Sequence, residues 1–472
     1  MSNHSAPFLT PTWVKNAVFY QIFPERFANG DVQNPFKRAL PWGTKPTISN
    51  YMGGDLQGII NHLDYLTDLG ITALYLNPIF LAASNHKYNT TDYFQIDPQY
   101  GRLETFQELV KQAHKRDIRL ILDGVFNHVG RGFFAFTDLL ENQAESPYLN
   151  WFHPTALPLN AYDETQPANY ASWWNIRSLP KLNVAHPPVE QYILNVARYW
   201  LEKGIDGWRL DVPNEISDHE FWRKFRALVK AVNPEAYLVG EIWQDASPWL
   251  DGTQFDAVMN YLFCDLCRDF FAHETLPVSA FAEGIEKLLK LYPWEATLAQ
   301  LNLLGSHDIA RFRTAAGGEI SKFYAPILFQ MTFPGAPCIY YGDEIGLEGA
   351  KDPDCRRCFP WDGTAWNHDL RNWVQSCIRL RHKHPALRTG SFQTLLTRKP
   401  SQIYAFARWN SQESLFVILN PSAESVFFDL PLTDVPYQQQ IVQNLFNSKT
   451  YKIVDNQIKD IFLPKRSGMV LA

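Results

Sequence analysis

The chain has 472 residues, a length that suits one large domain with one or two accessory domains. Hydrophobic residues make up 46% of the chain and charged residues 19%, which is enough for a sizeable core. A net charge of -6 with no basic stripe argues against a nucleic-acid partner. The N-terminal residues lack a signal-peptide pattern and no run of 18 apolar residues occurs, so we expect a cytoplasmic protein with no membrane partner.

Eight short apolar runs lie between residues 17 and 345, and each indicates a β-strand. Amphipathic stretches with the i, i+3, i+4, i+7 spacing of helices lie between several of them, for example over 106–113, 193–200 and 221–232. Strands that alternate with helices predict a parallel sheet with crossovers, and eight such units predict an α/β fold of the (β/α)8 TIM-barrel type. The runs are Ala17–Phe23, Ala73–Leu76, Arg119–Phe126, Gly207–Val212, Ala236–Gly240, Ala257–Asn260, Gln300–Leu304 and Cys338–Tyr341.

Two segments depart from this alternation. Residues 128–187 are rich in Pro, Asn, Trp and Tyr and lack a clear period, and a structureless loop of that length is improbable in a compact domain. We therefore expect an inserted subdomain B after strand three. From residue 386 short alternating runs predict a C-terminal antiparallel β domain over 386–472. The barrel then comprises 1–127 and 188–385.

Carboxylates follow three of the predicted strands. Asp211 ends strand four, Glu241 ends strand five and Asp308 follows strand seven. The carboxyl ends of barrel strands meet on one rim, where the active sites of such barrels lie. A single strand-end aspartate is more often a helix cap than a catalyst, so the joint placement of the three carries the argument.

The residues around these carboxylates fit glycoside hydrolysis with retention of configuration. In that chemistry an ionised carboxylate attacks the anomeric carbon, and a protonated one gives its proton to the leaving oxygen. Arg209 lies two residues before Asp211 on the same strand, so both side chains face the same way and the cation favours an ionised Asp211. His128 and His307 follow strands three and seven on the same rim.

Four sequence blocks resemble those of the α-amylase superfamily, glycoside hydrolase family 13. The blocks are Asp-Gly-Val-Phe-Asn-His at 123–128, Gly-Trp-Arg-Leu-Asp-Val-Pro-Asn-Glu at 207–215, Gly-Glu-Ile-Trp at 240–243 and Leu-Gly-Ser-His-Asp at 304–308. The resemblance implies that Asp211 is the nucleophile, Glu241 the acid/base and Asp308 the transition-state stabiliser. It also implies that three further residues hold the reacting sugar, namely His128, Arg209 and His307.

Further blocks resemble the neopullulanase and cyclomaltodextrinase group of that superfamily. Leu-Pro-Lys-Leu-Asn at 179–183 and Gly-Ala-Pro-Cys-Ile-Tyr-Tyr-Gly-Asp-Glu-Ile-Gly-Leu at 335–347 are similar to blocks of this group. The resemblance implies a sugar-stacking role for Tyr88 and places Trp243 where α-1,4 and α-1,6 linkages are told apart. It assigns binding of the next sugar on the non-reducing side to Asp352 and Arg356.

One departure concerns the N-terminus. Members of the group carry an N-terminal β domain that shapes a closed dimer, whereas the first barrel strand here is expected from residue 17. We therefore expect a chain without that domain and with a more open cleft. A homodimer is compatible with the resemblance, whereas a cleft without the closed dimer argues against a preference for cyclodextrins.

A calcium site is implied by the resemblance of Phe-Ala-Asn-Gly-Asp-Val-Gln-Asn-Pro at 27–35 to a calcium loop of the same group. Its oxygen ligands suit Ca2+, while Pro35 stands where an aspartate is expected. The alternative is an Asn-Gly-Asp turn held by its own hydrogen bonds. The candidate ligands are Asn29, Asp31, Asn34, the Gly53 carbonyl and Asp55.

Six cysteines include two Cys-x-x-Cys pairs. Cys264 and Cys267 lie in an apolar, helix-like stretch and are expected to be packing residues. Cys355 and Cys358 flank two arginines, which are expected to lower a thiol pKa and would permit a reversible disulfide.

These observations predict a hydrolase of α-1,4 bonds, with some α-1,6 cleavage, in maltooligosaccharides, cyclodextrins or pullulan. Transfer to sugar acceptors is compatible with the mechanism. The alternatives are a debranching enzyme, a 4-α-glucanotransferase and, from another class, a catalytically silent glucan-binding protein. The last is disfavoured because all three carboxylates are present.

Overall fold

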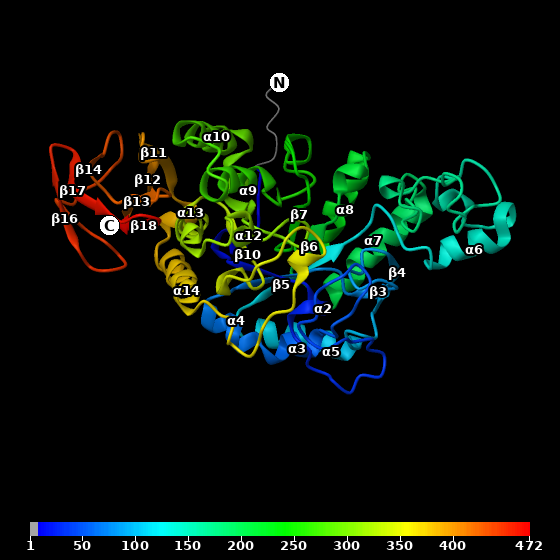
Figure 1. Cartoon of the computed structure of the whole chain (residues 1–472). Helices are drawn as coiled ribbons and strands as arrows, with labels where there is room; N and C mark the ends of the chain where they lie inside the picture. The colour runs from blue at the N-terminus through cyan, green and yellow to red at the C-terminus, as the bar shows by residue number, and fades with distance from the viewer. Residues whose placement is uncertain (1–7) are drawn as a thin grey trace, which may run out of the picture.

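A computed structural model describes residues 8–472, and residues 1–7, on which part of the signal-peptide expectation rests, lie outside that range. All eight apolar runs form strands of one parallel sheet, in the order β8-β7-β6-β5-β2-β1-β10-β9. A parallel bridge between Met259 and Leu301 joins the two ends of the sheet, so the predicted (β/α)8 barrel is confirmed (Figure 1). The barrel strands are β1 Phe19–Ile22, β2 Ala73–Leu76, β5 Arg119–Gly124, β6 Gly207–Leu210, β7 Tyr237–Gly240, β8 Ala257–Val258, β9 Leu301–Leu303 and β10 Ala336–Tyr340.

The crossover helices form where the apolar periodicity predicts them. α8 (His219–Val232) is capped by Asp218, whose carboxylate accepts hydrogen bonds from the backbone amides of Glu220 and Phe221. α7 (Pro187–Glu202) ends just before Gly204, which has the left-handed conformation that favours glycine. The other helices of the barrel region are α1 Thr12–Asn16, α2 Pro24–Phe27, α3 Leu56–Asn61, α4 Leu63–Leu69, α5 Leu103–His114, α9 Tyr261–Cys267, α10 Val278–Leu291, α11 Trp294–Ala299, α12 Phe312–Ala315, α13 Tyr324–Thr332, α14 His368–Lys383 and α15 Ala386–Thr389.

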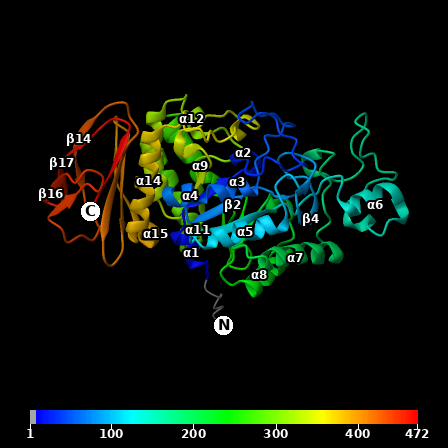
Figure 2. The ribbon, with the colours of Figure 1, turned by 90° about the horizontal axis from the view of Figure 1, so that it is seen from below.

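An inserted segment lies between β5 and α7, where the sequence predicts a subdomain. It contains α6 (Phe134–Asn142), which the sequence pattern does not predict, and isolated bridges such as that between Ser172 and Pro180. A hairpin of β3 (Phe80–Ala82) and β4 (Thr90–Ile96) leaves the barrel after β2. Figure 2 shows α6 at the end of the molecule opposite the C-terminal strands.

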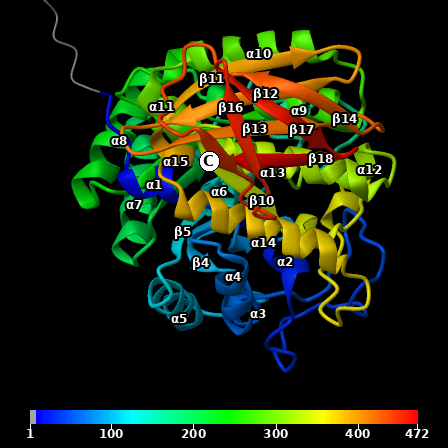
Figure 3. The same cartoon turned by 90° about the vertical axis from the view of Figure 1, so that its left-hand side faces the viewer.

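The C-terminal domain consists of two four-stranded antiparallel sheets, in the orders β11-β12-β13-β18 and β14-β17-β16-β15. The first sheet packs on helices of the barrel, with Phe406 of β12 against Phe329 of α13 at 5.7 Å between ring centres (Figure 3). Within residues 8–472 no helix has both the length and the apolar character needed to cross a bilayer. The strands are β11 Ser391–Arg398, β12 Ile403–Trp409, β13 Ser414–Asn420, β14 Val426–Pro431, β15 Ile441–Gln443, β16 Thr450–Val454, β17 Gln457–Leu463 and β18 Ser467–Leu471.

Candidate active site

Three carboxylates meet at the carboxyl-terminal rim of the barrel. Asp211 and Glu241 directly follow β6 and β7, and Asp308 lies in the loop after β9. Asp211 and Glu241 are buried, while the side chain of Asp308 keeps 29% of its surface exposed. Parallel strands of one barrel bring these positions together although they span almost 100 residues of sequence.

The guanidinium of Arg209 connects the carboxylates. Its Nη1 atom lies 2.8 Å from Oδ1 of Asp211 and 2.8 Å from Oδ1 of Asp123, and its Nη2 atom lies 2.9 Å from Oε2 of Glu241. Arg209 is fully buried, so these ion pairs are only weakly screened by water. Because one planar group contacts both, the carboxylates of Asp211 and Glu241 lie side by side.

Burial dominates the acidity of the cluster. It raises the pKa of Asp211, and the positive charge of Arg209 opposes that rise. The pKa of Asp308 is raised to about 7, chiefly by loss of hydration and next by the neighbouring charge of Glu241. Arg356 opposes this rise, so the charge state of Asp308 depends on its cationic neighbours.

Arg356 links Asp308 to the loop after β10. Its Nη2 atom lies 3.5 Å from Oδ1 of Asp308 and its Nη1 atom lies 3.1 Å from Oδ1 of Asp352. Its Nε–H donates to the carbonyl of His307 at 2.9 Å, which fixes the position of the guanidinium. The structure therefore brings Asp352 and Arg356 to the same site as the carboxylates.

Tyr88 and His307 belong to one buried hydrogen-bond network. Gln21 donates to Nδ1 of His307 at 2.9 Å, so the proton of the neutral ring is assigned to Nε2, which lies 2.6 Å from the Tyr88 hydroxyl. The hydroxyl in turn donates to Asp123 at 2.8 Å. Burial lowers the pKa of His307 well below its usual range, which favours this neutral form.

His128 lies at the start of the inserted segment and is buried. Its Nδ1 atom is 3.2 Å from the Asn127 amide nitrogen, whereas its Nε2 atom has no hydrogen-bond partner within residues 8–472. Burial lowers the pKa of His128 to about 3, so the ring is neutral, and the contact of Nδ1 with the Asn127 amide assigns its proton to Nε2. The ring stacks on Trp173 at 5.2 Å between centres.

Trp243 lies beside Glu241. Its indole N–H donates to Oε1 of Glu241 at 3.1 Å, and its ring stacks on Tyr261 at 3.9 Å and 8°. Trp243 keeps 40% of its surface exposed, so one part of an apolar ring faces solvent next to a carboxylate. Such a surface can stack on the apolar face of a ligand ring.

The five candidate calcium ligands do not converge on a vacant centre. Asn29 and Asp55 contact the ammonium of Lys37, and Asp55 also caps α3. Asn34 is engaged with the Pro98 carbonyl at 2.8 Å, and the Asp31 carboxylate accepts from the amide of Gln33. The chain of Lys37 passes Gly53, where an added Cβ would lie 3.5 Å from its Cδ atom.

The cysteine predictions have different outcomes. Cys264 and Cys267 are buried in α9, as expected for packing residues. The expectation of a lowered thiol pKa at Cys355 and Cys358 is wrong, because burial raises both values to about 12 and outweighs the nearby arginines. All six cysteines are free thiols.

Some residues of the site are not among the predicted ones. Gln21 in β1 and Asn77 after β2 bond each other at 3.1 Å and carry the network to the far side of the barrel. Polar residues at the ends of apolar strands are the signal that could have identified both. Tyr261, which supports Trp243, has no such signal because it opens a helix.

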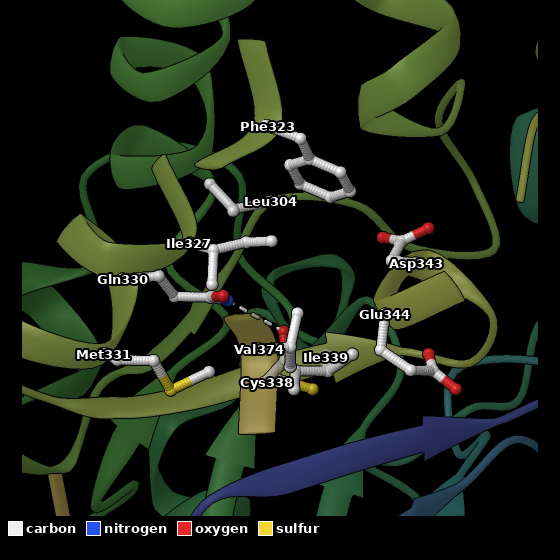
Figure 4. Close-up of a pocket in the computed structure, with 10 residues that line it drawn as sticks. All are labelled: Leu304, Phe323, Ile327, Gln330, Met331, Cys338, Ile339, Asp343, Glu344 and Val374. Carbon is white, nitrogen blue, oxygen red and sulfur yellow. Dashed lines mark hydrogen bonds between the residues drawn. The ribbon is translucent and has the colours of Figure 1, made fainter. Parts of the chain in front are cut away.

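A separate cavity lies behind β9 and β10 against α13 (Figure 4). Its lining is mostly apolar, and the Gln330 amide within it donates to the Cys338 carbonyl at 2.9 Å. Glu344 at its edge accepts hydrogen bonds from Tyr20 and Tyr65. Asp343, the other acid in its lining, pairs with Arg311 at 2.8 Å, so this cavity does not present three carboxylates around one cation as the barrel rim does.

Comparison with known proteins agrees with this geometry. The protein-family model described as the α-amylase catalytic domain matches residues 21–390. A cyclomaltodextrinase from Bacillus sp is 51% identical over 88% of this chain and 74% of that protein, and neopullulanase 2 from Thermoactinomyces vulgaris is 47% identical over 89% and 72%. The debranching enzyme of Nostoc punctiforme, whose structure is solved, shares 46% sequence identity with this chain. Its structure superposes with a TM-score of 0.90 over 99% of this chain and 100% of that one. The chain therefore belongs to the α-amylase family of glycoside hydrolases, in its neopullulanase- and cyclomaltodextrinase-like group.

Proposed function

We propose that this enzyme hydrolyses α-glucosidic bonds in α-glucan oligosaccharides with retention of configuration. The observation that carries the proposal is the contact of one guanidinium, that of Arg209, with both Asp211 and Glu241. A retaining glycosidase requires two adjacent carboxyl groups, and a neighbouring cation favours the ionised form of the nucleophile. The names of the relatives, among them cyclomaltodextrinase and neopullulanase, support α-glucans as the substrate class.

In the first step Asp211 attacks the anomeric carbon while Glu241 gives its proton to the departing glycosidic oxygen. Arg209 occupies Oδ1 of Asp211, so we assign the attack to Oδ2. A covalent glycosyl-enzyme results. In the second step water attacks the same carbon, Glu241 takes its proton, and Asp211 is released as a carboxylate. Asp308 stabilises the positive charge that develops on the sugar in both steps.

Neutral donors hold the reacting sugar in this proposal. His128 offers an unpaired Nε2–H, and His307 offers an Nε2–H that it shares with Tyr88. Tyr88 presents its ring to the sugar. Arg356 and Asp352 bind the next sugar on the non-reducing side, where both have partly exposed side chains.

The part of the site that binds the leaving group determines which linkage is cleaved and whether water or a sugar hydroxyl accepts the glycosyl group. Trp243, exposed beside Glu241, gives this side an apolar surface on which an acceptor ring can stack. Cleavage of α-1,6 bonds and transfer to a sugar hydroxyl are therefore part of the proposal. A debranching activity is the second candidate, supported by the likeness along the whole chain to the debranching enzyme of Nostoc punctiforme.

Product analysis tests the two candidates. The enzyme is incubated with maltoheptaose, β-cyclodextrin, pullulan and a branched glucosyl-maltooligosaccharide, and early products are separated by chromatography. Short linear products from maltoheptaose support α-1,4 hydrolysis, and products longer than the substrate reveal transfer. Preferential cleavage of the branched substrate would favour debranching. No turnover on any of them would contradict the proposal.

A further inference from the structure

The loop expected to bind calcium contains a buried lysine. The side chain of Lys37 is only 6% exposed, and its ammonium nitrogen lies 2.5 Å from Oδ1 of Asn29 and 2.5 Å from Oδ2 of Asp55. These are two of the oxygens that a cation in this loop would use. The ammonium therefore lies between oxygens of the kind that bind calcium.

The side chains of Asp55 and Asn34 are already engaged in hydrogen bonds within the protein. The Asp55 carboxylate accepts hydrogen bonds from the amides of Gly30, Asp31 and Gly58 at 2.6–3.0 Å. Asn34 is bonded to the Pro98 carbonyl and accepts from the amide of Phe36. Calcium takes six to eight oxygen ligands, whereas the side-chain oxygens of Asp31, Asn34 and Asp55 already accept hydrogen bonds from backbone amides.

We propose that the Lys37 ammonium takes the place of a calcium ion, so that this loop is held by an internal cation. A second positive charge beside a buried ammonium would be repelled, and Asp55 supplies a single negative charge that Lys37 already balances. The folded enzyme is then independent of calcium. The lysine also ties the loop of residues 29–37 to the first turn of α3, which Asp55 caps.

The test begins with the unaltered enzyme as purified, in which we expect less than one calcium ion per chain by mass spectrometry. Its Tm should be the same after overnight chelation with EDTA and in calcium chloride. Removing the cation in Lys37→Ala leaves Asp55 as an unpaired buried charge, so the Tm should fall by about 5 °C or more. Lys45→Ala, at an exposed lysine of the following loop, is the matched control and should leave the Tm unchanged.

A double variant tests the exchange of one cation for the other. Pro35→Asp with Lys37→Ala supplies the carboxylate expected at position 35 and removes the ammonium from between Asn29 and Asp55. The Tm of this variant should therefore rise when calcium is added. A fall in the Tm of the unaltered enzyme in EDTA, or bound calcium at one ion per chain, would overturn the proposal. So would a Tm for Lys37→Ala equal to that of the unaltered enzyme. Should Lys37→Ala fail to fold, the measurements on the unaltered enzyme still decide.

A different observation concerns an aromatic stack in the inserted segment. Trp173 stacks on buried His128 and also on Trp174, at 4.5 Å and 10° between the two indoles. Trp174 is 74% exposed, and its backbone has the left-handed conformation, with φ 48° and ψ 31°. Asn175 follows with φ 59°. Two successive non-glycine residues in this region cost free energy and expose a large apolar ring, a combination found at functional sites.

We infer that Trp174 is a binding platform for a glucose ring beyond the reacting sugar. The inference rests on the proposed function and extends it, because the stack begins at His128 on the rim of the site and ends at the exposed indole. A flat apolar ring suits the apolar face of glucose, and Trp173 fixes its orientation. The platform serves α-glucans long enough to reach it.

Chain-length dependence tests the platform. Trp174→Ala should raise KM for maltoheptaose roughly 2- to 10-fold, as expected for one lost stacking contact, with kcat and the values for maltotriose unchanged. Trp174→Phe should restore most of the affinity. Trp294→Ala, at another exposed tryptophan, is the control. An equal change for both substrates, or none for either, would overturn the inference. A lack of hydrolysis by the unaltered enzyme would instead contradict the proposed function.

Discussion

Nη1 of Arg209 lies 2.8 Å from Oδ1 of Asp211, and the arginine has no exposed surface. This ion pair opposes the effect of burial, which raises the pKa of Asp211. The same guanidinium contacts Asp123 and Glu241, so the charge, position and spacing of the two proposed catalytic carboxylates depend on one side chain.

Arg209→Lys tests this dependence. An ammonium is one compact charge and cannot contact three carboxylates as a planar guanidinium does. We expect kcat/KM on maltoheptaose to fall by about 100-fold or more, comparable to the loss of one fixed donor in other enzymes. Arg223→Lys, at a half-exposed arginine of α8, should leave kcat/KM unchanged. An active Arg209→Lys enzyme would show that the bridge is not needed.

The acid limb of the pH profile should respond to Asp352 and Arg356 with opposite signs. Asp308, whose pKa is raised to about 7, is charged above that pKa, and we expect activity to require the charged form. Arg356 lowers the pKa of Asp308 and Asp352 raises it. Arg356→Gln should therefore move the acid limb of kcat/KM to higher pH, and Asp352→Asn should move it to lower pH. Shifts in the same direction would contradict this assignment.

Asp123 should contribute to stability as well as to the site. It is fully buried, pairs with Arg209 and accepts hydrogen bonds from the hydroxyls of Tyr75 and Tyr88. Asp123→Ala removes one partner of a buried ion pair, so the free energy of unfolding in urea should fall by roughly 3–5 kcal/mol. Asp64→Ala, which removes an exposed partner of Arg116, should change it by about 1 kcal/mol or less. Equal effects of the two substitutions would refute the prediction.

Trp243 combines a hydrogen bond and a stacking surface, and two substitutions separate them. Trp243→Phe loses the donor to Glu241 and keeps a ring on Tyr261, so kcat should fall roughly 10-fold with the ratio of pullulan to maltoheptaose hydrolysis preserved. Trp243→Ala loses both and should also change that ratio. An unchanged ratio in Trp243→Ala would exclude a role in linkage choice.

The barrel could be predicted from the sequence because its strands are buried on both faces. β2, β6 and β7 are entirely buried and read as short apolar runs between amphipathic helices. The C-terminal antiparallel β domain predicted from residue 386 is confirmed, but not all of its strands could be predicted. β11 is half exposed along its length and shows no apolar run, and β16 directs only Tyr451 and Ile453 to the core, an alternation too short to mark a strand.

Some of the candidate functional residues could likewise be predicted from the sequence, and others could not. Asp211, Glu241 and Asp308 could be selected because strand ends of a barrel converge, and the sequence blocks supported them. Lys37 could not, since no periodicity distinguishes it from any other lysine in a polar loop. Its position depends on Asp55, a residue 18 positions away that the fold brings beside it.

Identification of the nucleophile tests the central claim most directly. A fluorinated maltosyl fluoride, whose ring fluorine slows the second step, is incubated with the enzyme, and the labelled peptide is sequenced by mass spectrometry. We predict one sugar per chain, attached to Asp211. A label on Glu241, on Asp308 or on any residue other than Asp211 would contradict the account.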